Sequence, residues 1–225
     1  MKVTWIGQAG LYVETAGLKI IIDPYLSDCV GKMDKSKSRR VPVKEELFDI
    51  QPDVMIFTHD HLDHYDPETA EKYLKKEQPF TVLGPMSCWK HAREQVGGPH
   101  NYVMFDAGVE WTEGPVHFIA VPAIHSDPMA IGVIIESEGK RIYVTGDTLY
   151  GRKVLDALPR DIDAVFLPIN GVGNNMNKAD AARFAEACGA KTAYPMHFGM
   201  MDDLDPTDFP FEKKVIPVIY QEMEL

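Results

Sequence analysis

The chain is poor in several features that define common protein classes. It has only three cysteines, Cys29, Cys88 and Cys188, which are widely separated and odd in number. This usage indicates neither a disulfide framework nor a cysteine zinc site, so we expect reduced thiols. No apolar run is long enough to span a membrane, and residues 1–8 lack the apolar region of a signal peptide. We therefore expect a cytoplasmic protein without membrane contacts.

Positive charge is also scarce, because 23 lysines and arginines face 34 aspartates and glutamates and leave a net charge of −11. Nucleic-acid binding depends on neutralising phosphates with basic side chains, so this balance argues against a nucleic-acid partner and favours a small-molecule substrate. The length of 225 residues and the hydrophobic fraction of 45% are those of an ordinary globular protein. We expect one domain over residues 1–225, and nothing in the sequence indicates an oligomeric state.

The residue run Thr58-His59-Asp60-His61-Leu62-Asp63-His64 directly follows an apolar stretch, residues 54–57, that is typical of a buried strand. Polar residues at a strand end are often no more than a solvated loop. Three histidines and two aspartates within six residues instead favour a metal site. If the extended conformation persists, His59 and His61 project from the same face and can share one metal, while Asp63 and His64 can face a second.

This run resembles the H-x-H-x-D-H motif of the metallo-β-lactamase superfamily, whose other ligands come from later in the chain. The matching residues are His125 after the apolar stretch 116–121, Asp147 in Thr-Gly-Asp-Thr, and His197 in Pro-Met-His. Without the family pattern, each of these residues would be an ordinary loop or turn residue. The resemblance implies an α/β fold, the four-layered αββα sandwich, with metals at one edge of the sheets.

The resemblance also implies how the ligands divide between two divalent metal ions. His59, His61 and His125 would bind one ion, Asp63, His64 and His197 the other, and Asp147 would bridge them. Nitrogen and oxygen ligands suit zinc, our default, and also manganese or iron. Two cations that share a water give a hydroxide nucleophile at neutral pH, so the expected enzyme is a metal-dependent hydrolase with Asp63 and Asp147 as catalytic residues.

Within the superfamily the chain most resembles the ascorbate-6-phosphate lactonase group. The likeness lies in Thr-His-Asp-His-x-Asp-His, Gly84-Pro85 leading to Cys88, Gly-Asp-Thr-x-Tyr at 146–150, and residues 176–197. It implies a small anionic ester or lactone as substrate. The alternatives are a phosphodiesterase or thioesterase of the same superfamily and a diiron redox protein. The flavodiiron redox proteins carry glutamate at the position of His61 and have a flavin domain that this chain lacks.

Periodicity and turn residues predict the order of the elements. Strands are expected at 2–6, 11–14 and 18–22 along one edge of a sheet, followed by helix 67–76, strand 80–83 and helix 86–96. Strands at 102–105, 116–121, 132–136 and 141–145 are expected to begin the second sheet, with further strands at 165–169 and 192–196 and a helix from about 178 to 188.

Two features remain open at this level. Residues 27–43 read as a loop that carries the cations Lys32, Lys35, Lys37, Arg39 and Arg40. This loop is either a solvated surface or a patch that draws an anionic substrate toward the metals. Asp23 precedes Pro24, where it either starts a turn or, as in the resembling family, lies behind the metal site.

Overall fold

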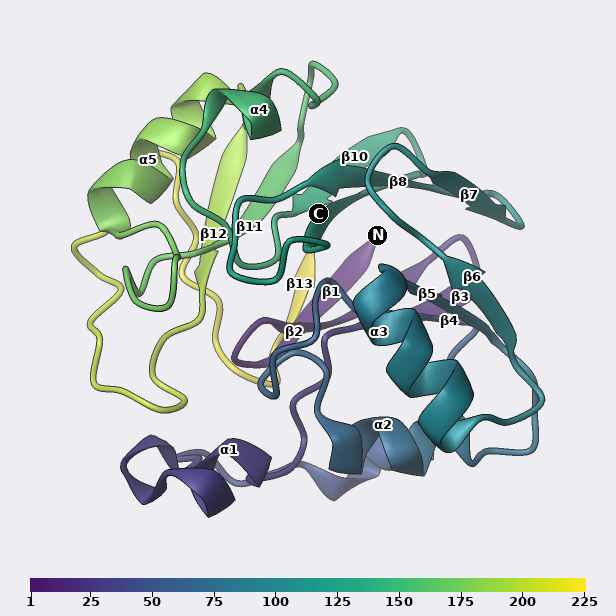
Figure 1. Cartoon of the computed structure of the whole chain (residues 1–225). Helices are drawn as coiled ribbons and strands as arrows, with labels where there is room; N and C mark the ends of the chain where they lie inside the picture. Colours follow the sequence, from purple (N-terminus) through teal and green to yellow (C-terminus); the bar gives the residue numbers. More distant parts are fainter.

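The computed structural model describes residues 1–225. It contains two β-sheets that face each other, with helices on the outer face of each (Figure 1). The first sheet comprises β1 (Lys2–Gly7), β2 (Gly10–Thr15), β3 (Leu18–Ile22), β4 (Val54–Ile56), β5 (Thr81–Gly84), β6 (Asn101–Met104) and β13 (Glu222–Glu224). The second comprises β7 (Glu110–Glu113), β8 (Val116–Pro122), β9 (Ile131–Ser137), β10 (Lys140–Val144), β11 (Ala164–Pro168) and β12 (Thr192–Met196).

The helices connect these strands. They are α1 (Cys29–Met33), α2 (Pro67–Leu74), α3 (Met86–Lys90), α4 (Arg152–Leu155) and α5 (Lys178–Ala187). Two 3-10 helices, Lys35–Lys37 and Glu45–Asp49, follow α1, and a π-helical segment, His91–Val96, continues α3. The predicted helices at 67–76, 86–96 and 178–188 are thereby confirmed.

Side-chain alternation along the central strands builds the layers. In β3, Ile20 and Ile22 belong to the core between the sheets, whereas Ile21 belongs to a separate core beneath α2 and α3. Val54 and Ile56 of β4 face inward in the same way. Since successive strand residues point to opposite faces, a continuous apolar run serves a sheet that is covered on both sides. The result is the predicted four-layered αββα sandwich.

Because many strands run parallel, the loops that follow them lie at one edge of each sheet. The order in the first sheet is β13-β1-β2-β3-β4-β5-β6, and β3 to β6 run parallel. The order in the second is β12-β11-β10-β9-β8-β7, with β10, β11 and β12 parallel. Parallel strands end at the same edge of a sheet, where α/β proteins commonly place their sites.

Three details differ from the sequence-based expectation. Strand β6 pairs with β5 in the first sheet, so the second sheet begins at β7 and not at 102–105. Strand β13 pairs with β1, so β1 to β3 do not form the edge of the sheet. Residues 27–43 are not simply a loop, because they contain α1 and a 3-10 helix.

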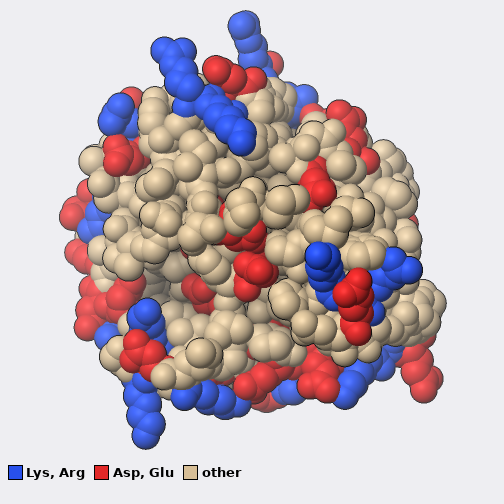
Figure 2. Space-filling view, viewed as in Figure 1, with Lys and Arg blue, Asp and Glu red and all other residues tan.

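The cations of this segment are mostly engaged with other residues. Lys32 pairs with Glu68, Arg40 pairs with Asp203, and Arg39 donates to the carbonyl oxygens of Tyr25 and Val41. In the surface view, acidic side chains lie near the middle of the face shown, and many basic side chains project from its margins (Figure 2). None of the helices has the length and apolar character needed to cross a membrane.

Candidate metal centre

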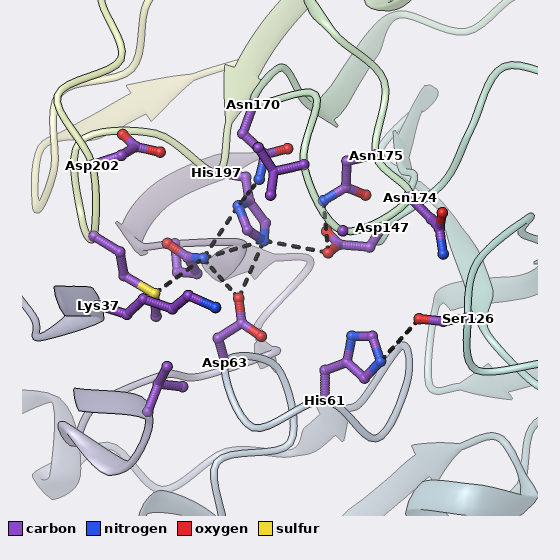
Figure 3. A pocket seen from close by; sticks show the side chains of 15 residues that line it. Lys37, His61, Asp63, Ser126, Asp147, Asn170, Asn174, Asn175, His197 and Asp202 are labelled. Carbon is purple, nitrogen blue, oxygen red and sulfur yellow. Dashed lines mark hydrogen bonds and ion pairs between the residues drawn. The ribbon is translucent and has the colours of Figure 1, made fainter. Parts of the chain in front are cut away.

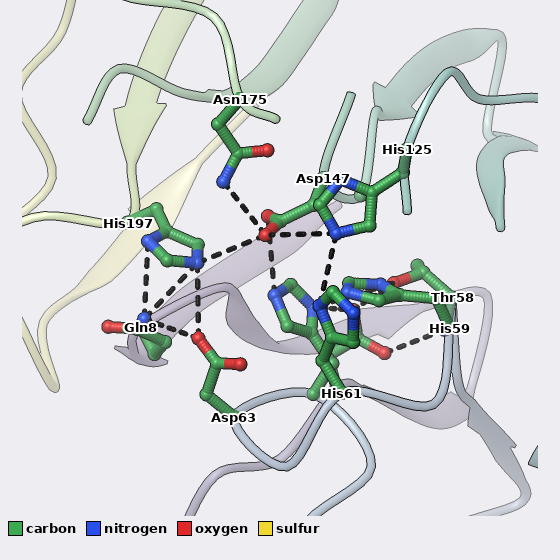
Figure 4. Close-up of polar contacts among 12 residues, drawn as sticks. Gln8, Thr58, His59, His61, Asp63, His125, Asp147, Asn175 and His197 are labelled. Atoms are coloured by element: carbon green, nitrogen blue, oxygen red, sulfur yellow. Dashed lines mark hydrogen bonds and ion pairs between the residues drawn. The ribbon is translucent and has the colours of Figure 1, made fainter. Parts of the chain in front are cut away.

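The predicted site residues all lie at strand ends on one edge of the sandwich. His59, His61, Asp63 and His64 follow β4 in the first sheet. The second sheet contributes three more, because His125 follows β8, Asp147 follows β10 and His197 follows β12. The structure therefore brings together, from both sheets, all seven residues that the sequence singled out, and all of them except His64 are labelled in Figure 4.

His59, His61 and His125 form a compact group. Their ring centroids are 4.6 to 4.7 Å apart in all three pairs. His61 Nδ1 lies 3.1 Å from His125 Nε2. One nitrogen from each ring falls within 4.8 Å of the others, which is a spacing that could hold a metal ion.

Asp63, His64 and His197 form a second such group. Asp63 Oδ2 lies 3.2 Å from His197 Nε2. Asp147 lies between the two groups: its Oδ2 is 3.3 Å from His197 Nε2 and 3.9 Å from His125 Nε2, and its Oδ1 is 3.2 Å from His64 Nε2. A carboxylate in this position is within reach of both groups.

Each imidazole is held by its second nitrogen. His64 Nδ1 donates to Asp23 Oδ2 at 2.7 Å, and His125 Nδ1 donates to the carbonyl oxygen of Asn174 at 3.3 Å. The corresponding contacts of the other rings are His59 Nδ1 with Thr58 Oγ1 at 3.1 Å, His61 Nε2 with Ser126 Oγ at 3.2 Å, and His197 Nδ1 with the Asn170 amide at 3.0 Å. Such contacts orient a metal-binding imidazole, so that its free nitrogen faces the centre.

Asp23 is the best defined of these supports. It is fully buried, and its Oδ1 accepts a 2.8 Å hydrogen bond from the Thr58 backbone nitrogen while Oδ2 accepts from His64. The sequence left Asp23 open between a turn residue and a residue behind the site. The structure places it behind His64.

Several buried polar atoms lack a hydrogen-bond partner at the centre. They are His59 Nε2, His64 Nε2 and Asp147 Oδ1, of which the last two lie 3.2 Å apart as an ion pair. Buried polar groups in proteins are almost always hydrogen-bonded, so three such atoms that converge on one point require an explanation. Nitrogen and carboxylate oxygen donors are good ligands for a divalent cation, and the residues present therefore fit metal binding.

Electrostatic coupling shifts the titration of the second group. Burial alone would lower the pKa of His197, but Asp147 and Asp63 raise it to about 10. Burial likewise opposes protonation of His64, yet Asp147, Asp23 and Asp63 hold its pKa well above the usual value. Burial would raise the pKa of Asp147, whereas His197 and His64 hold it well below its usual range. Protons on these histidines thus balance the carboxylates when no cation does.

His59 and His125 of the first group behave in the opposite way. Burial, with His64 adding its positive charge, holds the pKa of His59 well below its usual value. Burial also lowers the pKa of His125, although Asp147 partly counteracts this effect. Both imidazoles are therefore neutral at pH 7, the form in which a histidine binds a metal.

Gln8 is a site residue that the sequence did not reveal. Its side-chain Nε2 donates to Asp63 Oδ2 at 2.7 Å and lies 3.2 Å from both ring nitrogens of His197. Its backbone carbonyl oxygen accepts a hydrogen bond from the His197 backbone nitrogen. Gln8, Asp23 and His197 all have positive φ angles, of 50°, 42° and 62°. Non-glycine residues rarely adopt this conformation, and it is found most often at functional sites.

A cavity of about 420 Å³ opens over the centre (Figure 3). Its walls include Asp63, Asp147 and His197 and, from the loop after β11, Asn170, Asn174 and Asn175. The buried Asn175 donates through Nδ2 to Asp147 Oδ2 at 2.8 Å. Lys37 is the only lysine or arginine in the lining.

Gln8 and the asparagines carry no motif that sequence reasoning could have used. The only signal was their position, since Gln8 follows the first predicted strand and the asparagines follow the strand at 165–169. Ser126 has the same kind of signal, because it follows His125 directly.

Comparison with known proteins identifies the family. A model described as "Beta-lactamase superfamily domain" matches residues 19–198. A UPF0173 metal-dependent hydrolase of Ligilactobacillus salivarius is 32% identical over 220 residues, covering 93% of this chain and 91% of that protein.

Two solved structures share the fold. A metallo hydrolase from the archaeon Ignicoccus hospitalis has a TM-score of 0.77 at 19% identity and covers 100% of this chain and 98% of that one. An isothiocyanate hydrolase from Delia radicum gut bacteria has a TM-score of 0.78 at 22% identity and covers 100% and 99%. The chain therefore belongs to the metallo-β-lactamase superfamily, among the UPF0173 metal-dependent hydrolases.

Proposed function

We propose that this hydrolase uses two divalent metal ions, zinc by default, to cleave a small anionic ester or lactone. The observation that carries the proposal is the position of Asp147 between two groups of potential ligands, one of three histidines and one of Asp63, His64 and His197. Two cations held there would supply Lewis acidity, because they lower the pKa of a water between them and polarise the carbonyl oxygen of the substrate.

The side chains of the chain itself orient and balance this centre. Asp63 and Asp147 supply negative charge on the cavity floor, and we assign catalytic roles to both. Gln8 and Asn175 each donate one hydrogen bond to these carboxylates, at 2.7 and 2.8 Å, and so fix which oxygen remains free. Preorganised donors and acceptors of this kind spare the site from rearranging during the reaction.

The substrate class rests on the cavity walls. Beside the candidate ligands, amide groups, one lysine and Asp202 line the cavity, and only three of its 15 lining residues are hydrophobic. Such a surface suits a compact polar molecule. Lys37 offers a single positive charge for an anionic group, whereas the net charge of −11 would repel a polyanion. The likeness to ascorbate-6-phosphate lactonases also favours a small anionic substrate.

We further propose that residues 1–225 form one domain and that the protein lies in the cytoplasm.

Metal content and turnover test the proposal together. Purified protein is stripped with chelator, reconstituted with zinc, manganese or iron, and analysed for metal per chain. It is then assayed with lactones, thioesters, phosphodiesters and an isothiocyanate. We expect two metals per chain and preferential cleavage of anionic lactones or esters. Saturation at one metal per chain would contradict the bridging role of Asp147. Cleavage of phosphodiesters that is faster than cleavage of lactones and esters would contradict the proposed substrate class.

A further inference from the structure

We propose that the substrate of this enzyme carries a short aliphatic arm, which lies in a second hollow beside the metal centre. This inference deepens the proposed hydrolase function and rests on it. The hollow has a volume of about 390 Å³ and lies between α1 and the loop that carries His61 and Asp63. The apolar side chains in its wall are Val30, Met33 and Leu62.

The hollow adjoins the cavity over the metal centre. Val30, Lys37, His61 and Asp63 line both of them. A molecule whose reacting group lies over Asp63 can therefore extend past His61 and along α1 without leaving the protein surface. Lys37 stands at the junction, where it can contact an anionic group between the reacting group and the arm.

Met33 is the reason to assign an aliphatic occupant. Its side chain is 79% exposed, the highest exposure among the large hydrophobic residues of the chain. An isolated exposed apolar side chain needs no explanation, but Met33 shares one hollow with Val30 and Leu62 next to a reactive centre. Methionine is flexible and polarisable, so it adapts to alkyl chains of different shape.

The charges in the hollow argue against a polar occupant. Asp34, Asp60 and Asp63 belong to the same wall, and Lys37 is its only lysine or arginine. A second phosphate or carboxylate would meet these three carboxylates there, whereas methylene groups carry no charge to repel. A volume of about 390 Å³ suits a small molecule and not a protein segment, so we assign a short alkyl arm.

Binding of n-alkyl carboxylates tests this inference without requiring turnover. Zinc-loaded protein is titrated calorimetrically with the series from acetate to octanoate. Transfer of a methylene group out of water can tighten binding by up to about fourfold, so in this open hollow we expect about a twofold gain per carbon. Met33→Ser should flatten this dependence and leave acetate binding unchanged, and Met33→Leu should restore it. Met129→Ser is the matched control, because Met129 is also exposed but lines neither cavity.

The outcomes separate this inference from the proposed function. A chain-length dependence that is absent in wild type, or identical in Met33→Ser, would overturn the aliphatic arm whatever the enzyme hydrolyses. A dependence that Met33→Ser removes, in a protein that hydrolyses no lactone or ester, would retain the arm and reject the proposed reaction. Hydrolysis that quickens with chain length in wild type alone would support both.

Discussion

Asp23 lies outside the candidate ligands, yet its contacts predict an effect on metal binding. Its carboxylate accepts from His64 Nδ1 and from the Thr58 backbone, so it fixes both the ring and the start of the ligand loop. Residues in this position typically change metal affinity by about 10- to 100-fold. We expect Asp23→Asn to weaken zinc binding by about this factor, as measured by competition with a chromophoric chelator.

The control for Asp23 is Asp53→Asn. Asp53 also accepts a backbone hydrogen bond, from Lys19, but it lies outside the site. Its replacement should leave zinc affinity unchanged. Equal losses in the two variants would mean that Asp23 acts through general stability and not through His64.

Lys37 carries the electrostatic part of the substrate proposal. Lys32 and Arg40 form ion pairs, and Arg39 donates hydrogen bonds to backbone carbonyl oxygens. Lys37 is therefore the cation that lines the cavity over the site. We expect Lys37→Ala to lower kcat/KM for an anionic lactone by about tenfold, with a weaker dependence on salt than wild type.

Lys35→Ala provides the comparison, because Lys35 lies in the same 3-10 helix but outside the cavity lining. Its kcat/KM should match that of wild type. If both variants behave alike, or if a neutral lactone loses as much rate as the anionic one, Lys37 does not bind the anionic group.

The seven candidate ligands could be predicted, although not all from local spacing. His59 to His64 form a local motif, whereas the three later residues, which each follow a predicted strand, were singled out by the order of ligands in the resembling family. Gln8 and Asn175 could not be predicted, because their partners lie 55 and 28 positions away in sequence. A polar residue with one distant partner leaves no local pattern.

At the level of elements, α2 shows how a helix start fixes the ligand loop. Asp66 caps this helix by accepting hydrogen bonds from the backbone nitrogens of Glu68 and Thr69, at 3.0 and 3.3 Å, only two residues after His64. Loss of an aspartate cap costs about 0.5 to 2 kcal/mol of stability. We expect Asp66→Ala to fall at the upper end, because the carboxylate is fully buried.

Urea unfolding followed by circular dichroism measures this cost. Glu71→Ala in the same helix removes an exposed ion pair with Lys75 and should cost no more than about 0.5 kcal/mol. A midpoint for Asp66→Ala as high as that for Glu71→Ala would show that the cap contributes little.

The elements themselves could be predicted from the sequence more readily than the way they pair. Helix α2 was predicted from apolar periodicity and strand β4 from a continuous apolar stretch, and both are local signals. The sheet membership of β6 and the pairing of β13 with β1 were not, because they depend on which strands meet after the chain has folded. Strand β13 has only three residues, too few to establish a period.

For the molecule as a whole, the coupled histidines and carboxylates predict how pH acts on the metal-free protein. The pKa of His197 is raised from 6.5 to about 10. Its contribution to the free energy of unfolding is therefore complete below about pH 6.5 and is lost as pH rises through 10. The pKa of Asp147 lies well below 3.8, so its contribution is present above about pH 3.8 and is lost as pH falls further. The lowered pKa values of His59 and His125 act in the opposite sense, because their contribution to stability is present above about pH 6.5 and is lost as pH falls below it. Stability of the metal-free protein should therefore be highest near pH 6.5.

Zinc should reverse this trend on the alkaline side. Binding requires neutral imidazoles, so protonated His64 and His197 must release their protons, and affinity should rise from pH 5.5 to pH 8.5. Thermal unfolding with and without zinc across this range gives the measurement, and titration in buffers of different ionisation enthalpy counts the protons. A stabilisation by zinc that does not grow with pH, with no proton release at pH 7, would contradict the coupling.

The origin of the ligands in two sheets has a consequence for assembly. Four of the seven candidate ligands follow β4, and the other three follow strands of the opposing sheet, so each ion would be bound from both halves of the sandwich. The carbonyl oxygen of Thr58 also accepts from Ile131 of that sheet at 3.0 Å. A chain cut between β6 and β7 would yield two fragments that each hold an incomplete set of ligands. Metal binding would then stabilise the complex of the two fragments, and the affinity of the fragments for each other would increase with the metal concentration.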